Sequence, residues 1–265
     1  MVAAPVSFDS GAGVAVRLRG VTKTYDNGVA ALGPIDLEVR RAEFVSLLGP
    51  SGCGKSTALR LIAGLSAASS GLVEVSGHQA RKNSIGFVFQ EPTLMPWTSV
   101  RENVRLPLKL AHVPRDQADA RVGDALAQVG LSEFADAYPR ELSGGMKMRV
   151  SLARALVTDP DILLMDEPFA ALDEITRFRL NNDLLALWRN LHKTVIFVTH
   201  SVFESVYLSQ RVIVMTPRPG RIAGEFSIDS AEPRTEAFRT SPEYAAHCRD
   251  VSMALAHASG EKLAS

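Results

Sequence analysis

Short apolar runs separated by helical patterns are the main feature of this chain. Three of them, Phe44–Leu48, Ile162–Met165 and Thr194–Thr199, contain few polar side chains. Such runs are typical of strands buried on both faces, as in parallel sheets that helices cover. Longer segments with apolar residues at helical spacing lie between them, and Glu174–Leu191 is one. The alternation predicts an α/β fold with a mostly parallel central sheet.

A mostly helical insertion is predicted over Glu91–Leu142. The strand-like runs stop there, and prolines, Pro107 among them, interrupt the pattern. Together with the helix that follows it, the insertion gives a helical subdomain of about residues 91–157. We expect its helices at Gln117–Val129, Leu131–Tyr138 and Lys147–Val157.

Two β runs precede the first buried strand. Val14–Leu18 alternates apolar and polar residues, and Ile35–Val39 is a second short candidate. Asn27-Gly28 between them is a turn signal, so we expect a small N-terminal antiparallel sheet attached to the core. The other expected elements are helices at Ala58–Ala63, Ser201–Leu208 and Pro242–His257 in a short tail over 227–265, strands at Leu72–Val75 and Ile85–Phe89, and a hairpin of Arg211–Met215 and Arg221–Phe226.

Composition and charge limit which partners and which cellular compartment are compatible with the sequence. Twenty-nine Lys and Arg residues balance 29 Asp and Glu residues, which gives no support for a large nucleic-acid surface. No apolar run approaches the ~20 residues of a membrane span, and Met1–Gly13 lacks the pattern of a secretory signal. Cys53 and Cys248 are too few and too far apart for a disulfide framework, so we expect reduced thiols. Any membrane role would then depend on a partner.

The strongest chemical signal is the segment Gly49–Thr57, which fits the phosphate-binding pattern G-x-x-x-x-G-K-[ST]. It follows a predicted strand and opens a predicted helix, as that pattern requires. Its glycines let backbone N–H groups surround phosphate oxygens, and the helix dipole adds to the attraction. Lys55 can reach the β- and γ-phosphates, and the Ser56 hydroxyl can ligate Mg²⁺. The nine residues are Gly49, Pro50, Ser51, Gly52, Cys53, Gly54, Lys55, Ser56 and Thr57.

Two carboxylates end the buried strand at Ile162–Met165, where open α/β sheets place their ligands. Asp166 suits Mg²⁺ coordination, and Glu167, which strand alternation should orient differently, could polarise a water molecule. His200 follows another buried strand, Thr194–Thr199. From its position alone, this histidine is either a structural residue or part of the site.

Two further signals also allow a structural interpretation. Tyr25 either offers a flat surface on which a purine ring stacks, or is an ordinary half-buried tyrosine at a strand end. Ser143, Gly144 and Gly145 precede a predicted helix, with N-cap chemistry and exposed N–H groups. They form either a second anion site or a common glycine-rich helix start.

From about Val14 to Met215, the chain resembles the ATP-binding subunit of ABC transporters. That resemblance implies a P-loop NTPase of ABC type in one ATP-binding domain over 1–265, which hydrolyses ATP to drive translocation. The motifs that carry it are, in order, Tyr25 in the aromatic-loop position, Gly49–Thr57 as Walker A, Gln90 as the Q-loop, Leu142–Met146 as the signature, Ile162–Glu167 as Walker B, Ala170–Asp173 as the D-loop and His200 as the switch histidine.

The resemblance also implies a mechanism. Two copies face head to tail, so that each ATP lies between Walker A of one copy and the Ser143–Met146 signature of the other. Glu167 is then the general base that activates the attacking water. The remaining implied roles are Lys55 and His200 at the γ-phosphate, Ser56, Gln90 and Asp166 at Mg²⁺, and Tyr25, Ser143, Gly144, Gly145 and Asp173 at the nucleotide.

Two departures from the family pattern are visible. Met146 stands where the signature usually has Gln, and Ala42 stands in a turn where relatives usually place glycine. The anion-binding donors come from Ser143 and the glycine backbone, so we expect binding to survive. Met146, together with Phe89–Trp97 and Leu32–Ile35, resembles the importer branch for nitrate, alkanesulfonates and taurine, whose related members take up thiamine-precursor pyrimidines.

That branch implies partners. We expect a second ATP-binding subunit, a transmembrane permease that docks near Gln90 and the helical subdomain, and indirectly a solute-binding protein. The chain would then lie on the cytoplasmic face of the inner membrane, without binding nucleic acid.

Three other ATPase classes share these motifs. A DNA-repair or chromosome-organising head needs a long coiled coil between Walker A and the signature, where this chain has only residues 58–141 without sustained heptads. A translation-factor ATPase has two nucleotide domains in one chain. A subunit for lipid transport or cell division shares every catalytic motif, so this alternative stays open.

Overall fold

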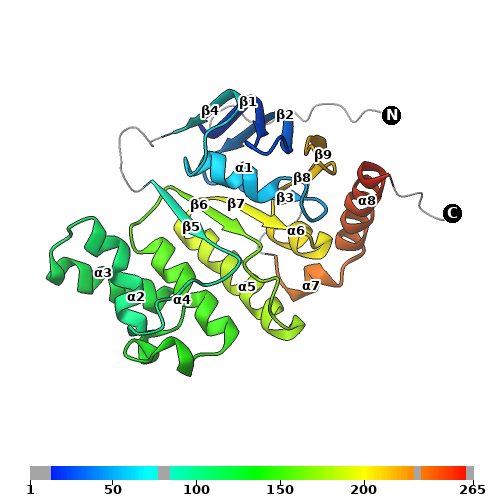
Figure 1. The fold of residues 1–265 in the computed structure, drawn as a ribbon. Coiled ribbons are helices and arrows are strands. Elements are labelled where there is room, and N and C mark those ends of the chain that lie inside the picture. The colour runs from blue at the N-terminus through cyan, green and yellow to red at the C-terminus, as the bar shows by residue number, and fades with distance from the viewer. Residues whose placement is uncertain (1–12, 77–83, 230–233, 261–265) are drawn as a thin grey trace.

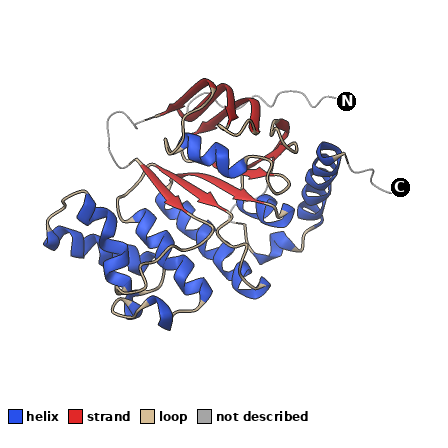
Figure 2. Cartoon of the chain, in the orientation of Figure 1, coloured by secondary structure: helices blue, strands red, loops and turns tan. Residues whose placement is uncertain are grey.

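Two β-sheets and their helices lie in layers in the computed structural model, which describes residues 13–76, 84–229 and 234–260. A six-stranded sheet crosses the middle of the molecule (Figure 1). A three-stranded sheet lies over one of its faces with helix α1 between them, and further helices cover the opposite face (Figure 2). The predicted α/β class, with a mostly parallel central sheet and an antiparallel β subdomain, is confirmed.

The six-stranded sheet has the order β5-β6-β7-β3-β8-β9. All neighbours pair in parallel except β9, which returns antiparallel to β8 as the predicted hairpin. Its strands are β3 (Phe44–Leu48), β5 (Ile85–Val88), β6 (Ile162–Asp166), β7 (Thr194–Thr199), β8 (Arg211–Met215) and β9 (Ile222–Ser227).

The apolar runs become strands that are buried on both faces. Every residue of β3 is buried, and its side chains alternate between two cores. Val45 and Leu47 belong to the core that includes α1 (Lys55–Ile62), whereas Phe44 and Leu48 belong to the core on the opposite side. Apolar residues at consecutive positions are stable only in such a middle layer.

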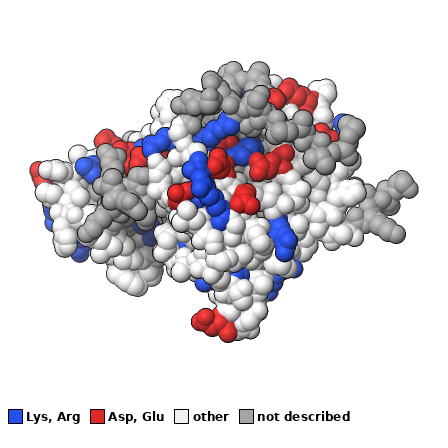
Figure 3. Space-filling view, turned by 90° about the horizontal axis from the view of Figure 1, so that it is seen from above, with Lys and Arg blue, Asp and Glu red and all other residues white. Residues whose placement is uncertain are grey.

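The smaller sheet has the order β2-β1-β4 and is antiparallel throughout. Its first two strands are longer than predicted, and Gly28, with φ +81°, lies in the turn that joins them. Arg17 forms ion pairs with Glu38 and Glu74 across this sheet. On the face seen in Figure 3, positive and negative side chains are interspersed. The strands are β1 (Val14–Thr24), β2 (Ala30–Arg40) and β4 (Ser70–Val75).

Three helices lie together beyond one end of the central sheet (Figure 1). The helix predicted at Leu131–Tyr138 is wrong, because only a 3-10 turn forms there, at Ser132–Phe134. The carbonyls of Ala135 and Ala137 instead accept bonds from the first turn of α2. The subdomain boundaries at about 91 and 157 stay a prediction. The helices are α2 (Val100–Leu110), α3 (Arg115–Gln128) and α4 (Gly144–Leu156).

The sequence pattern does not predict helix α2, because Pro107 lies inside it. Proline removes one backbone donor, yet the helix continues, and the N–H of Ala111 donates to the Pro107 carbonyl. Burial of Val100, Val104 and Leu108 along one face stabilises it.

The remaining helices follow β6 along the chain and pack against the core. No helix in the described ranges is both long and apolar enough to span a membrane. The predictions for Met1–Gly13 and for the end of the tail fall mostly outside the described residues. These helices are α5 (Glu174–Leu191), α6 (Val202–Leu208), α7 (Glu236–Arg239) and α8 (Pro242–Ser259).

Candidate functional site

The predicted phosphate-binding loop connects β3 to α1 in a conformation that requires glycine. Gly52 has φ +74° and Gly54 has φ +105°, values that other residues rarely adopt. A Cβ on Gly54 would lie 2.5 Å from the Cδ2 atom of Leu32 and 2.7 Å from the carbonyl oxygen of Ala31. The loop backbone therefore lies directly against β2, and a side chain at Gly54 would push the two apart.

Lys55 is held inside this loop, with 4% of its surface exposed. Its Nζ donates to the carbonyls of Gly49 at 2.7 Å and Pro50 at 3.0 Å, and lies 3.6 Å from a carboxylate oxygen of Glu167. A buried ammonium group whose hydrogen-bond acceptors are neutral carbonyls attracts an incoming phosphate oxygen strongly.

Ser56 and Asp166 meet beside the loop, where the Ser56 hydroxyl donates to Asp166 Oδ1 at 2.7 Å. Burial raises the pKa of the Asp166 carboxyl, although the Ser56 hydrogen bond acts in the opposite direction. In the described ranges, no three His, Cys, Asp or Glu side chains gather as a metal cage. A hydroxyl and one carboxylate fit Mg²⁺, because this ion takes oxygen ligands and usually keeps water and substrate phosphates as the others.

Glu167 lies between Lys55 and His200. One carboxylate oxygen faces Lys55, and the other lies 3.1 Å from Nδ1 of His200. The prediction that strand alternation orients Glu167 is wrong, because β6 ends at Asp166 and Glu167 has a left-handed φ of +46°. Its N–H donates to the Val198 carbonyl, so a turn anchored on β7 sets its direction.

Lys55, Ser56 and Glu167 line a cavity of about 340 Å³. Asp166 and His200 are not among its lining residues and instead contact Ser56 and Glu167, respectively. Tyr25 stands at its edge, 36% exposed, with its hydroxyl 3.2 Å from that of Thr57. Cys53 is not among the lining residues, and burial raises the pKa of its thiol. Cys53 and Cys248 are both free, as predicted. The lining residues are Tyr25, Val29, Ala31, Ser51, Gly52, Gly54, Lys55, Ser56, Thr57, Gln90, Glu167 and Arg218.

The structure does not bring the remaining predicted residues into this cavity. Ser143 caps α4 by accepting from the Met146 N–H at 3.3 Å, and a Cβ on Gly145 would lie 2.8 Å from Thr176. Asp173 caps α5 by accepting from the Thr176 N–H at 3.0 Å, and hydrogen bonding by Thr176 lowers its pKa. Ser143, Gly144, Gly145 and Asp173 thus belong to a second region, where the start of α4 packs against the start of α5.

Sequence reasoning missed Arg218. It comes from the loop between β8 and β9, donates from Nε to the Gly52 carbonyl at 3.2 Å and lines the cavity. The segment Pro217–Gly220 was interpreted only as a turn. Its place beside the phosphate loop follows from the pairing of β8 with β3, which no local signal indicates.

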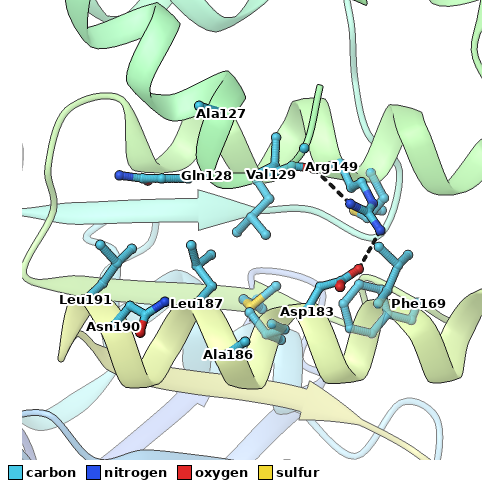
Figure 4. A pocket seen from close by; sticks show the side chains of 16 residues that line it. Ala127, Gln128, Val129, Arg149, Phe169, Asp183, Ala186, Leu187, Asn190 and Leu191 are labelled. Carbon is cyan, nitrogen blue, oxygen red and sulfur yellow. Dashed lines mark hydrogen bonds and ion pairs between the residues drawn. The ribbon is translucent and has the colours of Figure 1, made fainter. Parts of the chain in front are cut away.

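A second cavity, of about 360 Å³, lies between α3, α4 and α5 (Figure 4). Arg149 crosses it, donating to the Val129 carbonyl at the end of α3 and to Asp183 on α5. Its other lining residues are mostly apolar, and none is a predicted site residue.

Comparisons with known proteins agree with the motifs. The sequence profile described as ABC transporter matches residues 32–170. An ABC transporter ATP-binding protein of Methanocaldococcus jannaschii is 48% identical over 87% of this chain and 87% of its own length. The taurine import ATP-binding protein TauB of Rhizobium johnstonii is 44% identical over 88% of this chain and 91% of its own.

Solved structures of similar fold are also ABC proteins. The cbiO1 protein of Clostridium perfringens, part of the ABC transporter complex cbiONQ, superposes with a TM-score of 0.74 at 29% identity, covering 81% of this chain and 89% of that one. The ATP-binding cassette MJ0796, solved as a dimer bound to ADP and Pi, gives a TM-score of 0.71 at 34% identity, covering 82% and 100%.

Proposed function

The chain belongs to the ABC transporter family and is an ATP-hydrolysing subunit, and we propose that it drives a membrane importer for a small solute. The observation that carries this proposal is the similarity to taurine import ATP-binding proteins, which extends over nearly the full length of both chains. We infer an importer of taurine, an alkanesulfonate, nitrate or a related small solute, because Met146 and the segments Phe89–Trp97 and Leu32–Ile35 resemble that importer branch.

We assign ATP to the 340 Å³ cavity. Lys55 and His200 hold the terminal phosphate, and Glu167, in contact with both of them, accepts a proton from the attacking water. Ser56, Gln90 and Asp166 would hold Mg²⁺, which when bound draws charge from the phosphate oxygens. Tyr25 presents its ring to the adenine at the cavity edge.

Two copies of the chain would complete each site. Ser143, Gly144 and Gly145 have anion-binding geometry at the start of α4, yet they do not line the cavity of their own chain. A partner copy placed head to tail brings them to the phosphate. The similar cassette solved as a dimer with ADP and Pi supports this arrangement.

The remaining partners follow from the importer assignment. A transmembrane permease binds the chain on the cytoplasmic face of the membrane, and a solute-binding protein delivers the anion to that permease from the other side. ATP binding closes the two copies, and hydrolysis with phosphate release lets them open, which moves the permease.

The direct test is purification of the tagged protein from its native membranes. We expect a permease to co-purify, and the ATPase rate of the complex to rise when a binding protein loaded with taurine, an alkanesulfonate or nitrate is added. Complexes with Lys55→Ala serve as the matched control and should assemble without this rise. Recovery of cell-division or lipid-transport partners, or a rate indifferent to every anion, would contradict the importer proposal.

A further inference from the structure

The loop between β8 and β9 is fixed against the phosphate-binding loop. The Gly220 N–H donates to the Ala31 carbonyl at 3.0 Å, and the Gly33 N–H donates to the Gly220 carbonyl at 2.9 Å. A Cβ on Gly220 would lie 1.9 Å from the Cys53 carbonyl oxygen, so the two backbones touch. The backbone of this loop at Gly220 is therefore held at a constant position relative to the phosphate-binding loop.

Arg218 is the residue of this loop that lines the cavity, together with Lys55 and Ser56. Its Nε–H is bound to the Gly52 carbonyl, which fixes the plane of the guanidinium. Within the described ranges, no carboxylate forms an ion pair with Arg218. Arg218 is exposed, so the remaining N–H donors of its guanidinium are open to water and to a ligand in the cavity.

The charge at the cavity favours an anionic ligand on Arg218. A carboxylate oxygen of Glu167 lies 3.6 Å from Lys55, whereas Arg218 has no carboxylate partner among the described residues. A guanidinium presents its donors in a planar fork that matches phosphate oxygens. It also cannot lose its proton at neutral pH, so the charge is always present.

We propose that Arg218 is a second cationic contact to the phosphate chain of the bound nucleoside triphosphate, supplied by the β8–β9 loop. It acts on affinity, since Glu167 and Lys55 already provide the groups for hydrolysis. The competing role is purely structural, in which the bond to Gly52 braces the phosphate-binding loop and the guanidinium never touches the nucleotide.

Nucleotide titrations of Arg218→Gln separate these roles. ATP is titrated in EDTA, which prevents hydrolysis, and adenosine is measured by competition against a fluorescent ATP analogue. We expect the Kd for ATP to rise about tenfold to hundredfold, the range of a hydrogen bond to a charged group, with adenosine unaffected. The loss should shrink at high salt. Arg218→Lys should recover part of the affinity because it keeps the charge.

Arg221 gives a matched control in the same loop. Its side chain lies over Gly33, where a Cβ would be 2.6 Å from Nε, and it does not line the cavity. Arg221→Gln removes the same charge and should leave ATP affinity unchanged. An equal loss of ATP affinity in Arg221→Gln would mean that the effect of Arg218→Gln comes from the change in net charge alone, and would overturn the proposal.

Two other results would also overturn it. One is an unchanged affinity for ATP in Arg218→Gln. The other is an equal loss of affinity for ATP and for adenosine in both Arg218 variants, together with a lowered Tm, which would indicate that Arg218 only stabilises the phosphate-binding loop. The inference rests on the proposed assignment of ATP to this cavity. Lys55→Ala tests that assignment separately. If Lys55→Ala still binds ATP, the assignment of ATP to this cavity is rejected. If Lys55→Ala loses ATP binding while Arg218→Gln binds ATP with normal affinity, only the role of Arg218 is rejected.

Discussion

Asp166 and Glu167 are consecutive carboxylates in different surroundings. Asp166 is buried beside the Ser56 hydroxyl, and burial raises its pKa. Glu167 turns away from β6 with a left-handed backbone and contacts Lys55 and His200. These different surroundings suit the two roles proposed for them, Asp166 at Mg²⁺ and Glu167 as the general base.

Glu167→Gln should abolish turnover and leave ATP binding intact. The amide keeps the size of the side chain but cannot accept the proton of the attacking water, so the ATPase rate should fall about 10²- to 10⁴-fold. The measurement is phosphate release, with ATP affinity determined in parallel. Glu133→Gln, an exposed carboxylate in a 3-10 turn far from the cavity, is the control. Near-normal hydrolysis in Glu167→Gln would exclude the general-base role.

Asp166→Asn should stabilise the nucleotide-free protein at neutral pH while it abolishes hydrolysis. The folded-state pKa of Asp166 lies above its unfolded value, so ionisation costs more in the folded state. This penalty is absent below the unfolded pKa, grows as pH rises through the folded pKa and is complete above it. Urea unfolding in EDTA should show a gain in the variant that shrinks toward pH 4. A difference in the free energy of unfolding between the two proteins that does not change with pH would contradict the effect of burial on Asp166.

Ala42 adopts a conformation suited to glycine, with φ +58°, and its N–H donates to Thr194 Oγ1 at 3.0 Å. The left-handed backbone costs about 1 kcal/mol for an alanine, so Ala42→Gly should raise the free energy of unfolding by up to about 1 kcal/mol. Ala120→Gly, on the exposed face of α3, should lower it by about 1 kcal/mol. Chemical denaturation of both variants gives the sign of each change in the free energy of unfolding. A decrease in Ala42→Gly would contradict the backbone strain at Ala42.

Elements whose signals are local were predictable from the sequence. The buried strands β3, β6 and β7 and the phosphate-binding loop follow from consecutive apolar residues and a fixed glycine pattern. The failures have tertiary causes. Two carbonyls of Leu131–Tyr138, those of Ala135 and Ala137, accept bonds from α2, and Arg218 reaches the cavity only because β8 pairs with β3. Neither partner could be recognised within a window of neighbouring residues.

Arg149 should contribute to the attachment of the helical region to the core. It joins the end of α3 to α5 across the cavity of Figure 4 through Val129 and Asp183. Because the ion pair is partly exposed, Arg149→Met should lower the free energy of unfolding by only about 1 kcal/mol, mainly by releasing the Val129 carbonyl.

The matched control is Arg115→Met, since Arg115 pairs with Asp119 on the exposed side of α3. That change should stay within about 0.5 kcal/mol. Equal effects of the two variants in chemical denaturation would mean that the contact across the cavity adds nothing.

At the scale of the whole molecule, the two candidate anion sites lie apart from each other. The 340 Å³ cavity lies at the carboxyl ends of the parallel strands, whereas Ser143 and the glycines after it cap α4 beside α5. Local sequence patterns predict the first site and leave Ser143–Gly145 open between an anion site and a common helix start. The separation of the two regions depends on how α4 packs. Within one chain they do not line the same cavity, so the account requires two copies for a complete ATP site.

The most direct test of this requirement is the sedimentation mass of Glu167→Gln in ATP and Mg²⁺. We expect the mass of two chains with ATP and of one chain with ADP, because unhydrolysed ATP stays bound between the copies. Adding Ser143→Asp, which keeps N-cap chemistry but places a negative charge at the phosphate, should return the mass of one chain, whereas Ser143→Asn should not. If the Glu167→Gln protein saturates with ATP and still sediments as one chain, the composite site is contradicted.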